Sequence, residues 1–231
     1  MEQGPIGTGD YCAVMFTSRR RQYHTYMSAP RLRTGLLLCA VLAAAAGAAL
    51  FGRFRASSHN VAVAAQLRGT DVWPAGTQLA QPFALHDQRG ALISTAALRG
   101  HVWAITFLDS NCRELWPTEA RSLARVQQLL GPGTPLSIVI VSVLPRYDTP
   151  RTVTAFAHTA GLSGDWHWLL GTERQLQPVW HEYGIAVITG QQHTAALYLV
   201  DRTGHVRVAD AIPFRSGDLA GSIKALNGSR G

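Results

Sequence analysis

Residues His101–Leu130, "HVWAITFLDSNCRELWPTEARSLARVQQLL", carry the most informative pattern in the chain. Its first part, His101–Asp109, is apolar and rich in β-branched residues, which predicts a buried strand. From Thr118 to Leu130 the apolar residues recur at helical spacing, and Gly131-Pro132-Gly133 follows them, so we expect a helix that ends there. A single cysteine, Cys112, stands between strand and helix. A cysteine at such a connection is typical of a redox or metal site.

The segments around this stretch continue an alternation of strands and helices. The expected elements are a strand pair in residues 82–94, a central strand in 135–144, a helix beginning at Pro150 after the N-cap Thr149 and ending at Gly161, a short strand in 166–171, a helix in 172–184 interrupted by Pro178, a hairpin in 195–212 and a helix in 217–228. This order predicts a thioredoxin-like three-layer α/β/α sandwich with parallel central strands. Active groups of such sheets lie beyond the carboxyl ends of the strands, where Cys112 is placed.

The basic character of the chain is concentrated at its N-terminus. The formal net charge is +7, and residues 1–55 contribute seven arginines against two acidic residues, a net of +5. Residues 56–231 are left with a net of +2. A nucleic-acid footprint needs basic residues clustered on the folded domain. The distribution therefore argues against nucleic acid as a partner.

An apolar segment, Gly35–Gly52, runs for 18 residues without a charge. This is close to the length that spans a bilayer, about 17–25 residues. Arginines before and after it favour an N-terminus in the cytoplasm and a C-terminal domain outside it. We therefore expect a single-pass membrane helix in the cell membrane, with a cleaved signal peptide as the alternative. The expected organisation is a disordered cytoplasmic tail in 1–34, the transmembrane helix in 35–52, a tether in 53–80 and the domain in 81–231.

The three cysteines of the chain fall into three different regions. Cys12 lies in the tail, Cys39 in the apolar segment and Cys112 in the predicted domain. No disulfide can form inside the domain. A lone thiol in an exported domain is either reactive or a small buried hydrophobic residue.

Three segments carry a resemblance to a known family. They are "PFALHDQRGALISTAALRGHVWAITFLDSNCRELWPTEARSLARV" (82–126), "IVIVSVLPRYDTPRTVTAFA" (138–157) and "HTAALYLVDRTGHVR" (193–207). Together they resemble the Sco/SenC family of membrane-anchored thioredoxin-fold proteins. Members of this family are copper-binding assembly factors for the copper centre of respiratory oxidase, and some look like thiol–disulfide reductases. The resemblance therefore implies a function of this kind. It also implies a site made of Cys-x-x-x-Cys-Pro and a distant histidine before a late strand.

Carried over by position, this site is only partly present in the chain. The first cysteine of the motif falls on Cys112, the proline on Pro117 and the histidine on His193. The second cysteine falls on Trp116, and an acidic residue that is frequent after "VSV" falls on Leu144. The resemblance thus implies a degenerate motif, with Cys112 and His193 as the candidate metal ligands.

The residues that remain limit the chemistry. A thiolate and an imidazole could hold Cu(I) in a two-coordinate way, because soft sulfur ligands favour Cu(I). Trp116 cannot bind a metal, so we expect weak binding, and a reversible internal disulfide is excluded. The resemblance implies copper as the cofactor. Besides the membrane, it implies a respiratory oxidase subunit or a redox protein as partner.

Two other interpretations stay open at this stage. In the first, the domain is a single-cysteine thiol oxidoreductase in which Cys112 forms mixed disulfides with an external partner. The helix N-terminus and Arg113 would stabilise the thiolate there, while Glu114 opposes it. In the second, the domain is a non-catalytic interaction module. Cys112 is then inert, and His193 is a hydrogen-bonded loop histidine.

Overall fold

The computed structural model describes residues 42–53, 60–113, 115–188, 192–193 and 195–228, with Ile188, Gln192 and His193 described by their backbone. The chain divides into two compact units, residues 1–50 and 51–231. Residues 42–53 are helical, and their side chains are exposed. In the described part of the chain, no helix has both the length and the apolar character needed to cross a membrane. The predicted tail 1–34, and residues 35–41 of the predicted transmembrane helix, lie outside the described residues.

The second unit is built on an eight-stranded sheet with the strand order β1-β10-β9-β4-β5-β6-β2-β3. The strands are β1 (Asp71–Val72), β2 (Ala84–Asp87), β3 (Leu92–Ser94), β4 (Trp103–Leu108), β5 (Ser137–Ser142), β6 (Trp166–Leu170), β9 (Ala196–Val200) and β10 (Val206–Ala211). Strands β4, β5 and β6 are parallel, whereas β9 pairs antiparallel with β4. A separate small ladder pairs β7 (Val187–Ile188) with β8 (Gln192–His193). The parallel centre agrees with the prediction, and the small ladder was not predicted.

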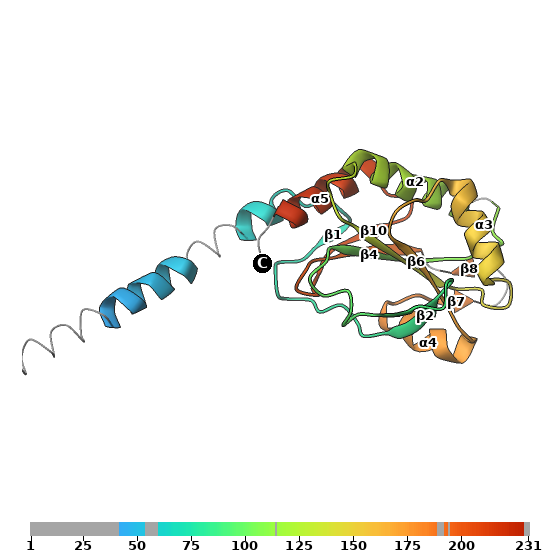
Figure 1. Ribbon diagram of the computed structural model, residues 1–231, viewed down its shortest axis with the longest axis horizontal. Helices are drawn as coiled ribbons and strands as arrows, with labels where there is room; N and C mark the ends of the chain where they lie inside the picture. The colour runs from blue at the N-terminus through green and yellow to red at the C-terminus, as the bar shows by residue number, and fades with distance from the viewer. Residues whose placement is uncertain (1–41, 54–59, 114, 189–191, 194, 229–231) are drawn as a thin grey trace, which may run out of the picture. The chain divides into compact units, whose positions relative to one another are not determined.

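Helices cover both faces of the sheet (Figure 1). One face carries α2 (Leu115–Leu130), α3 (Pro150–Ala160) and α5 (Ser216–Gly228), and the other carries α4 (Glu173–Glu182). Strand β4 serves both cores, because successive side chains of a strand point to opposite faces. Ala104 and Leu108 pack under α2, while Trp103, Ile105 and Phe107 pack on the α4 side. The predicted three-layer α/β sandwich is confirmed.

The helix α3 shows how local sequence sets the element boundaries. Thr149 is its N-cap, and the Thr149 hydroxyl accepts a hydrogen bond from the Thr152 backbone N–H at 3.2 Å. Pro150 occupies the first helical position, where a missing N–H costs nothing. Gly161 ends the helix with φ of +80°, a left-handed conformation that glycine adopts without strain. All three boundary residues were predicted from the sequence.

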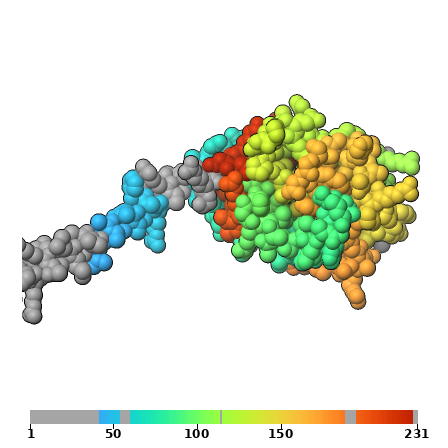
Figure 2. Space-filling model, viewed as in Figure 1, coloured from blue at the N-terminus to red at the C-terminus, as the bar shows by residue number. Residues whose placement is uncertain are grey.

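Part of the segment expected to be a tether belongs to the packed unit. Val63 and Leu67 are buried in the core on the α2 side. Asp71 and Val72 form β1, which pairs with β10 at the edge of the sheet. At the other edge, the β2–β3 hairpin contributes to the green surface visible in Figure 2.

The junction between β4 and α2 differs from the expectation. The helix begins at Leu115, three residues before the predicted start at Thr118. Trp116 therefore lies in its first turn, and Pro117 is its third residue. Proline is tolerated in a first turn, since the backbone N–H groups there have no partner within the helix.

Candidate functional site around Cys112

The loop that carries Cys112 is held by its own first residue. Strand β4 ends at Leu108, and the Asp109 carboxylate accepts hydrogen bonds from two backbone N–H groups that follow it. These are the amides of Asn111, at 2.9 Å, and Cys112, at 2.7 Å. Asp109 is itself buried. The Cys112 thiol is free and half-buried, and it packs against the core on the α2 side.

A second carboxylate ties this loop to the neighbouring one. Asp148 lies in the loop after β5, beside β4 in the sheet. It accepts hydrogen bonds from the Ser110 amide at 2.9 Å, the Ser110 hydroxyl at 2.6 Å and the Ser142 hydroxyl at 2.6 Å. Burial raises the pKa of the Asp148 carboxyl, and Asp109 raises it further, while the serine hydrogen bonds oppose this. The Cys112 loop is thus fixed from both sides.

Trp116 occupies the position that the resemblance assigns to a second cysteine. Its side chain is only 4% exposed and belongs to the core cluster on the α2 side. Cys112 packs against the same cluster. The indole therefore fills space in the core at the point where a second thiolate would be required. The mismatch seen in the sequence is also a difference in packing.

His193 lies in β8, where its backbone pairs with Val187. Its side chain lies outside the described residues. Among the residues that the structure describes, no group of three or more His, Cys, Asp and Glu side chains could hold a metal ion. The proposed pair of Cys112 and His193 remains a prediction, and its one sulfur and one nitrogen suit low-coordinate Cu(I).

Glu119 is a buried acidic residue near this site that the sequence analysis missed. It lies on α2, is 2% exposed, and its Oε1 atom is 2.7 Å from the Thr106 hydroxyl of β4. Its second oxygen, Oε2, is buried without a hydrogen-bond partner in the described structure. Burial raises the pKa of the Glu119 carboxyl to about 8, although the Thr106 hydrogen bond opposes this. Its spacing from Trp116 and Leu123, on the apolar face of the helix, was the available signal.

A second polar cluster lies away from Cys112, where β2 meets β6. The His167 ring lies between two carboxylates, with Nδ1 3.0 Å from Asp87 and Nε2 3.0 Å from Asp165. Arg89 adds an ion pair to Asp87 at 3.3 Å. Burial by itself would raise the pKa of Asp87, but hydrogen bonds from His167, Ala91 and Arg89 outweigh it and lower the value. The cluster joins the β2–β3 hairpin to the central strands.

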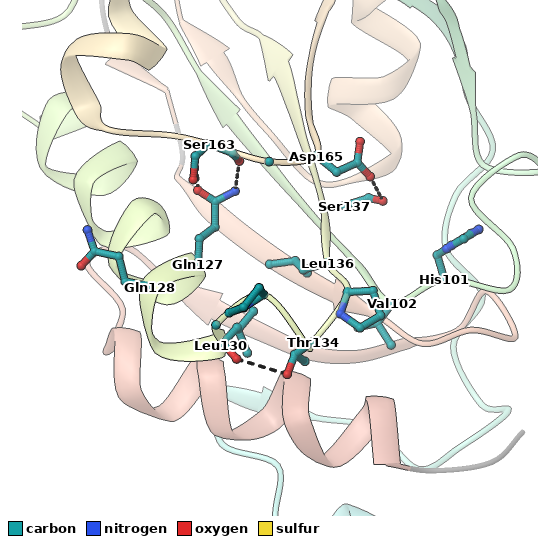
Figure 3. A pocket seen from close by; sticks show the side chains of 14 residues that line it. His101, Val102, Gln127, Gln128, Leu130, Thr134, Leu136, Ser137, Ser163 and Asp165 are labelled. Carbon is teal, nitrogen blue, oxygen red and sulfur yellow. Dashed lines mark hydrogen bonds between the residues drawn. The ribbon is translucent and has the colours of Figure 1, made fainter.

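A cavity of about 620 Å³ opens at the opposite end of the sheet from Cys112. Its walls come from the end of α2 and from the segments that precede β4, β5 and β6 (Figure 3). The Gln127 side chain bonds to the Ser163 backbone there, and the Ser137 hydroxyl donates to Asp165. The cavity therefore lies at the amino ends of the parallel strands, whereas Cys112 follows a carboxyl end.

The sequence pattern of the SCO1/SenC family matches residues 74–225. The SCO1 protein homolog of Bacillus subtilis is 31% identical over 93 residues, which are 39% of this chain and 48% of that protein. A SCO2-like protein of Rickettsia prowazekii is 26% identical over 137 residues, which are 53% of this chain and 64% of that protein. The chain thus matches between about half and two thirds of the length of these curated relatives.

Solved structures agree with this match in their fold. BsSco, described as a member of the Sco family of cytochrome c oxidase assembly proteins, has a TM-score of 0.59 at 21% identity, covering 70% of this chain and 100% of its own. Arabidopsis thaliana ScoI, solved with copper bound, has a TM-score of 0.56 at 20% identity, covering 64% of this chain and 97% of its own. At such identities the likeness shows the fold, which is the thioredoxin-like fold expected from the sequence.

Proposed function

Because the chain belongs to the SCO1/SenC family, we propose that it is a membrane-anchored, extracytoplasmic Sco-like protein with a reduced metal site. Its role is copper handling or the assembly of a respiratory oxidase. The observation that carries the proposal is the placement of Cys112. The thiol follows the carboxyl end of a central parallel strand, on a loop held by Asp109 and linked by Ser110 to Asp148.

Copper is the cargo in this proposal, and Cys112 and His193 are the residues that would hold it. A thiolate paired with an imidazole is a suitable donor set for Cu(I). Trp116 adds no ligand and packs in the core, which supports binding weaker than a site with two thiolates would give. The protein contacts of the domain then contribute more to its role than metal affinity does.

The membrane part of the proposal rests on the N-terminal sequence. The uncharged segment 35–52 is long enough to span a bilayer, and arginines flank it on both sides. The arginine excess before it favours a cytoplasmic N-terminus and a domain on the outer side. An oxidase subunit or a redox protein that meets the domain there is the proposed partner.

Cu(I) titration of the full-length chain in detergent tests the metal site. The parent for this experiment carries Cys12→Ser and Cys39→Ser, so that Cys112 supplies the only thiol. We expect weak Cu(I) binding that disappears in the Cys112→Ala/His193→Ala double variant. His181→Ala is the matched control, because the His181 side chain is 86% exposed on α4. Equal copper binding by the double variant and its parent would remove Cys112 and His193 as ligands.

A second candidate function is favoured by the exposure of Cys112. The thiol is free and only half-buried, so an external disulfide could reach it. As a single-cysteine thiol oxidoreductase, the protein with Cys12→Ser and Cys39→Ser would react through Cys112 with iodoacetamide at pH 7 faster than free cysteine does. An unreactive Cys112 would remove this candidate. If the thiol is unreactive and copper is not bound either, an interaction domain without chemistry of its own is left.

A further inference from the structure

Three groups on three different elements form a continuous polar chain inside the core. The Glu119 carboxyl of α2 lies 2.7 Å from the Thr106 hydroxyl of β4. The same hydroxyl lies 3.1 Å from the backbone carbonyl oxygen of Ala196, the first residue of β9. Thr106 and Glu119 are 1% and 2% exposed. The chain thus joins the helix that follows Cys112 to the strand that begins three residues after His193.

The number of hydrogen atoms decides which protonation state fits this arrangement. A threonine hydroxyl has one hydrogen to donate, and an ionised carboxylate can only accept. With Glu119 ionised, the Thr106 hydrogen would be drawn to the charged oxygen, and the Ala196 carbonyl would lose this donor. With Glu119 protonated, its O–H donates to Thr106, and Thr106 donates to Ala196. Both short distances are then hydrogen bonds.

The unpartnered oxygen of Glu119 also favours the protonated state of its carboxyl. Oε2 is buried and has no hydrogen-bond partner in the described structure. A buried charge without a partner costs far more free energy than a buried neutral carbonyl oxygen. A protonated Glu119 leaves only the neutral oxygen unpaired. The rise of the Glu119 pKa to about 8, caused by burial, agrees with this state.

The surroundings of Glu119 offer no counter-charge within the described residues. Strands β4 and β5 present only apolar and hydroxyl side chains, and α3 and α5 pack on α2 through apolar residues. The side chain of Tyr198 on β9 packs on the opposite face of the sheet. The charged or titratable groups on the packed helices are Arg121, Arg125, Arg151, His158 and Lys224, all exposed, and Asp218, half-buried. In the loops that follow β4 and β5, Asp109 and Asp148 accept the hydrogen bonds described above, Cys112 is half-buried and Arg113 is exposed.

We propose that Glu119 is a proton-holding positioning residue, whose neutral carboxyl fastens α2 to the start of β9 through Thr106 and so positions the segment that carries His193. Loss of this proton opens the link and weakens Cu(I) binding by Cys112 and His193. The copper part rests on the proposed function, whereas the link itself stands on the three atoms described. Glu119 acts through Thr106 and is not itself a metal ligand.

The link is tested without copper by hydrogen exchange of the Ala196 and Leu197 amides, corrected for the intrinsic pH dependence of exchange. In the full-length parent, protection at these amides should fall by about tenfold between pH 6.5 and pH 9, a coupling of ordinary size. Glu119→Gln keeps an uncharged donor and should stay protected at both pH values. Thr106→Val removes the relay and should be poorly protected at both, in a protein whose far-UV circular dichroism shows that it is folded.

Parent protection that does not change with pH would overturn the link. So would an identical pH response in Glu119→Gln. An exposed glutamate on α4, changed by Glu173→Gln, is the matched control and should respond to pH as the parent does.

Cu(I) affinity then tests the consequence for the site. In the background without Cys12 and Cys39, the parent and Glu119→Gln should bind Cu(I) equally at pH 6.5. At pH 9 the parent should bind Cu(I) about fivefold more weakly than Glu119→Gln does. If both proteins bind copper and their affinities are equal at both pH values, Glu119 does not regulate copper binding, but the proposed function still holds. If neither protein binds copper but the exchange results hold, the copper part of the proposed function fails and the link stands.

Discussion

Trp116 limits the copper and disulfide chemistry of the Cys112 site more than any other single residue. The resemblance assigns a second cysteine to position 116, which lies in the first turn of α2 and four residues after Cys112, so a cysteine there would add the second thiolate. The chain has an indole there instead, 4% exposed and packed in the core. Any gain of a second thiolate must therefore come with a loss of core packing.

Trp116→Cys makes both effects measurable in the background without Cys12 and Cys39. Replacing a large buried side chain by a small one should lower the free energy of unfolding by about 3 kcal/mol. The new thiolate should at the same time restore tight Cu(I) binding or allow a disulfide with Cys112. Thermal unfolding with and without Cu(I), and a thiol count after mild oxidation, measure the two effects.

Trp116→Ala is the matched control for this substitution, since it opens a similar space without adding sulfur. It should be destabilised to a similar extent and gain no copper affinity. If Trp116→Cys gains neither copper binding nor a disulfide while remaining folded, the geometry of the loop differs from a two-cysteine site as well as its residues.

Glu119 makes a second prediction at the scale of one residue. The pKa of its carboxyl is raised from 4.5 to about 8 in the folded protein, so folding requires a bound proton at neutral pH. The stability that depends on this proton is fully present below about pH 4.5 and is lost as pH rises toward 8. Glu119→Gln needs no proton and should be more stable at pH 7, by on the order of 3 kcal/mol. Urea unfolding at pH 5 and pH 8 measures the difference, which should be larger at pH 8.

At the scale of elements, the parallel pairing of β4 with β5 brings the two loops of the site together. Leu108 and Ser142, the last residues of these strands, are partners in the ladder. The loops that follow them are then joined by Asp148, which accepts hydrogen bonds from Ser110 and Ser142. The position of Cys112 is therefore set by a residue 36 positions further along the chain.

Asp148→Ala should loosen this connection. It removes three hydrogen bonds, and it leaves the donors of half-buried Ser110 and buried Ser142 unpaired. A loss of about 2–4 kcal/mol of stability is expected, together with faster alkylation of Cys112 under native conditions. Ser142→Ala removes one of the three hydrogen bonds and should give a smaller loss of stability, near 1 kcal/mol. An alkylation rate of Cys112 that Asp148→Ala leaves unchanged would mean that Asp109 alone holds the loop.

At the scale of the whole molecule, the proposed anchor accounts for the unequal distribution of charge. We expect the full-length protein to remain in membranes during alkaline carbonate extraction, with the C-terminal domain open to protease from the outer side. The double variant Leu42→Arg/Ala45→Arg places two charges in the middle of segment 35–52. Each should cost roughly 2.5–3.5 kcal/mol of insertion free energy, so this variant should be extracted. If alkaline carbonate extracts the chain without these substitutions, segment 35–52 is not a membrane anchor.

Much of the fold could be predicted because its signals are local. The apolar run in β5, the cap formed by Thr149 and Pro150, and the left-handed Gly161 each depend on residues close in sequence. The start of α2 was predicted too late, because its first turn combines a proline with Trp116 and gives a weak helical pattern. The β7–β8 ladder is only two residues long on each side, too short to leave a periodic signal.

The candidate site was predictable only in part. Cys112 could be placed beyond a central strand because strand and helix patterns lie directly on either side of it. The roles of Asp148 and Glu119 could not be predicted, since their partners Ser110 and Thr106 come from other elements. An acidic residue in a helix is ordinarily exposed, so the place of Glu119 on the apolar face was a weak signal, and the packing of α2 on β4 shows that it is buried.

Residue types and their spacing along the chain are sufficient for the layered α/β fold, the family resemblance and the absence of a second cysteine beside Cys112. These features are local, so they do not depend on which distant segments meet in the fold. Only the folded structure shows that the indole of Trp116 fills the core, that Asp148 holds the Cys112 loop, and that Glu119 is buried against Thr106 with one oxygen unpaired within the described residues. Burial and hydrogen bonding depend on which distant segments meet, and here the parallel sheet and the helices packed on it bring those segments together.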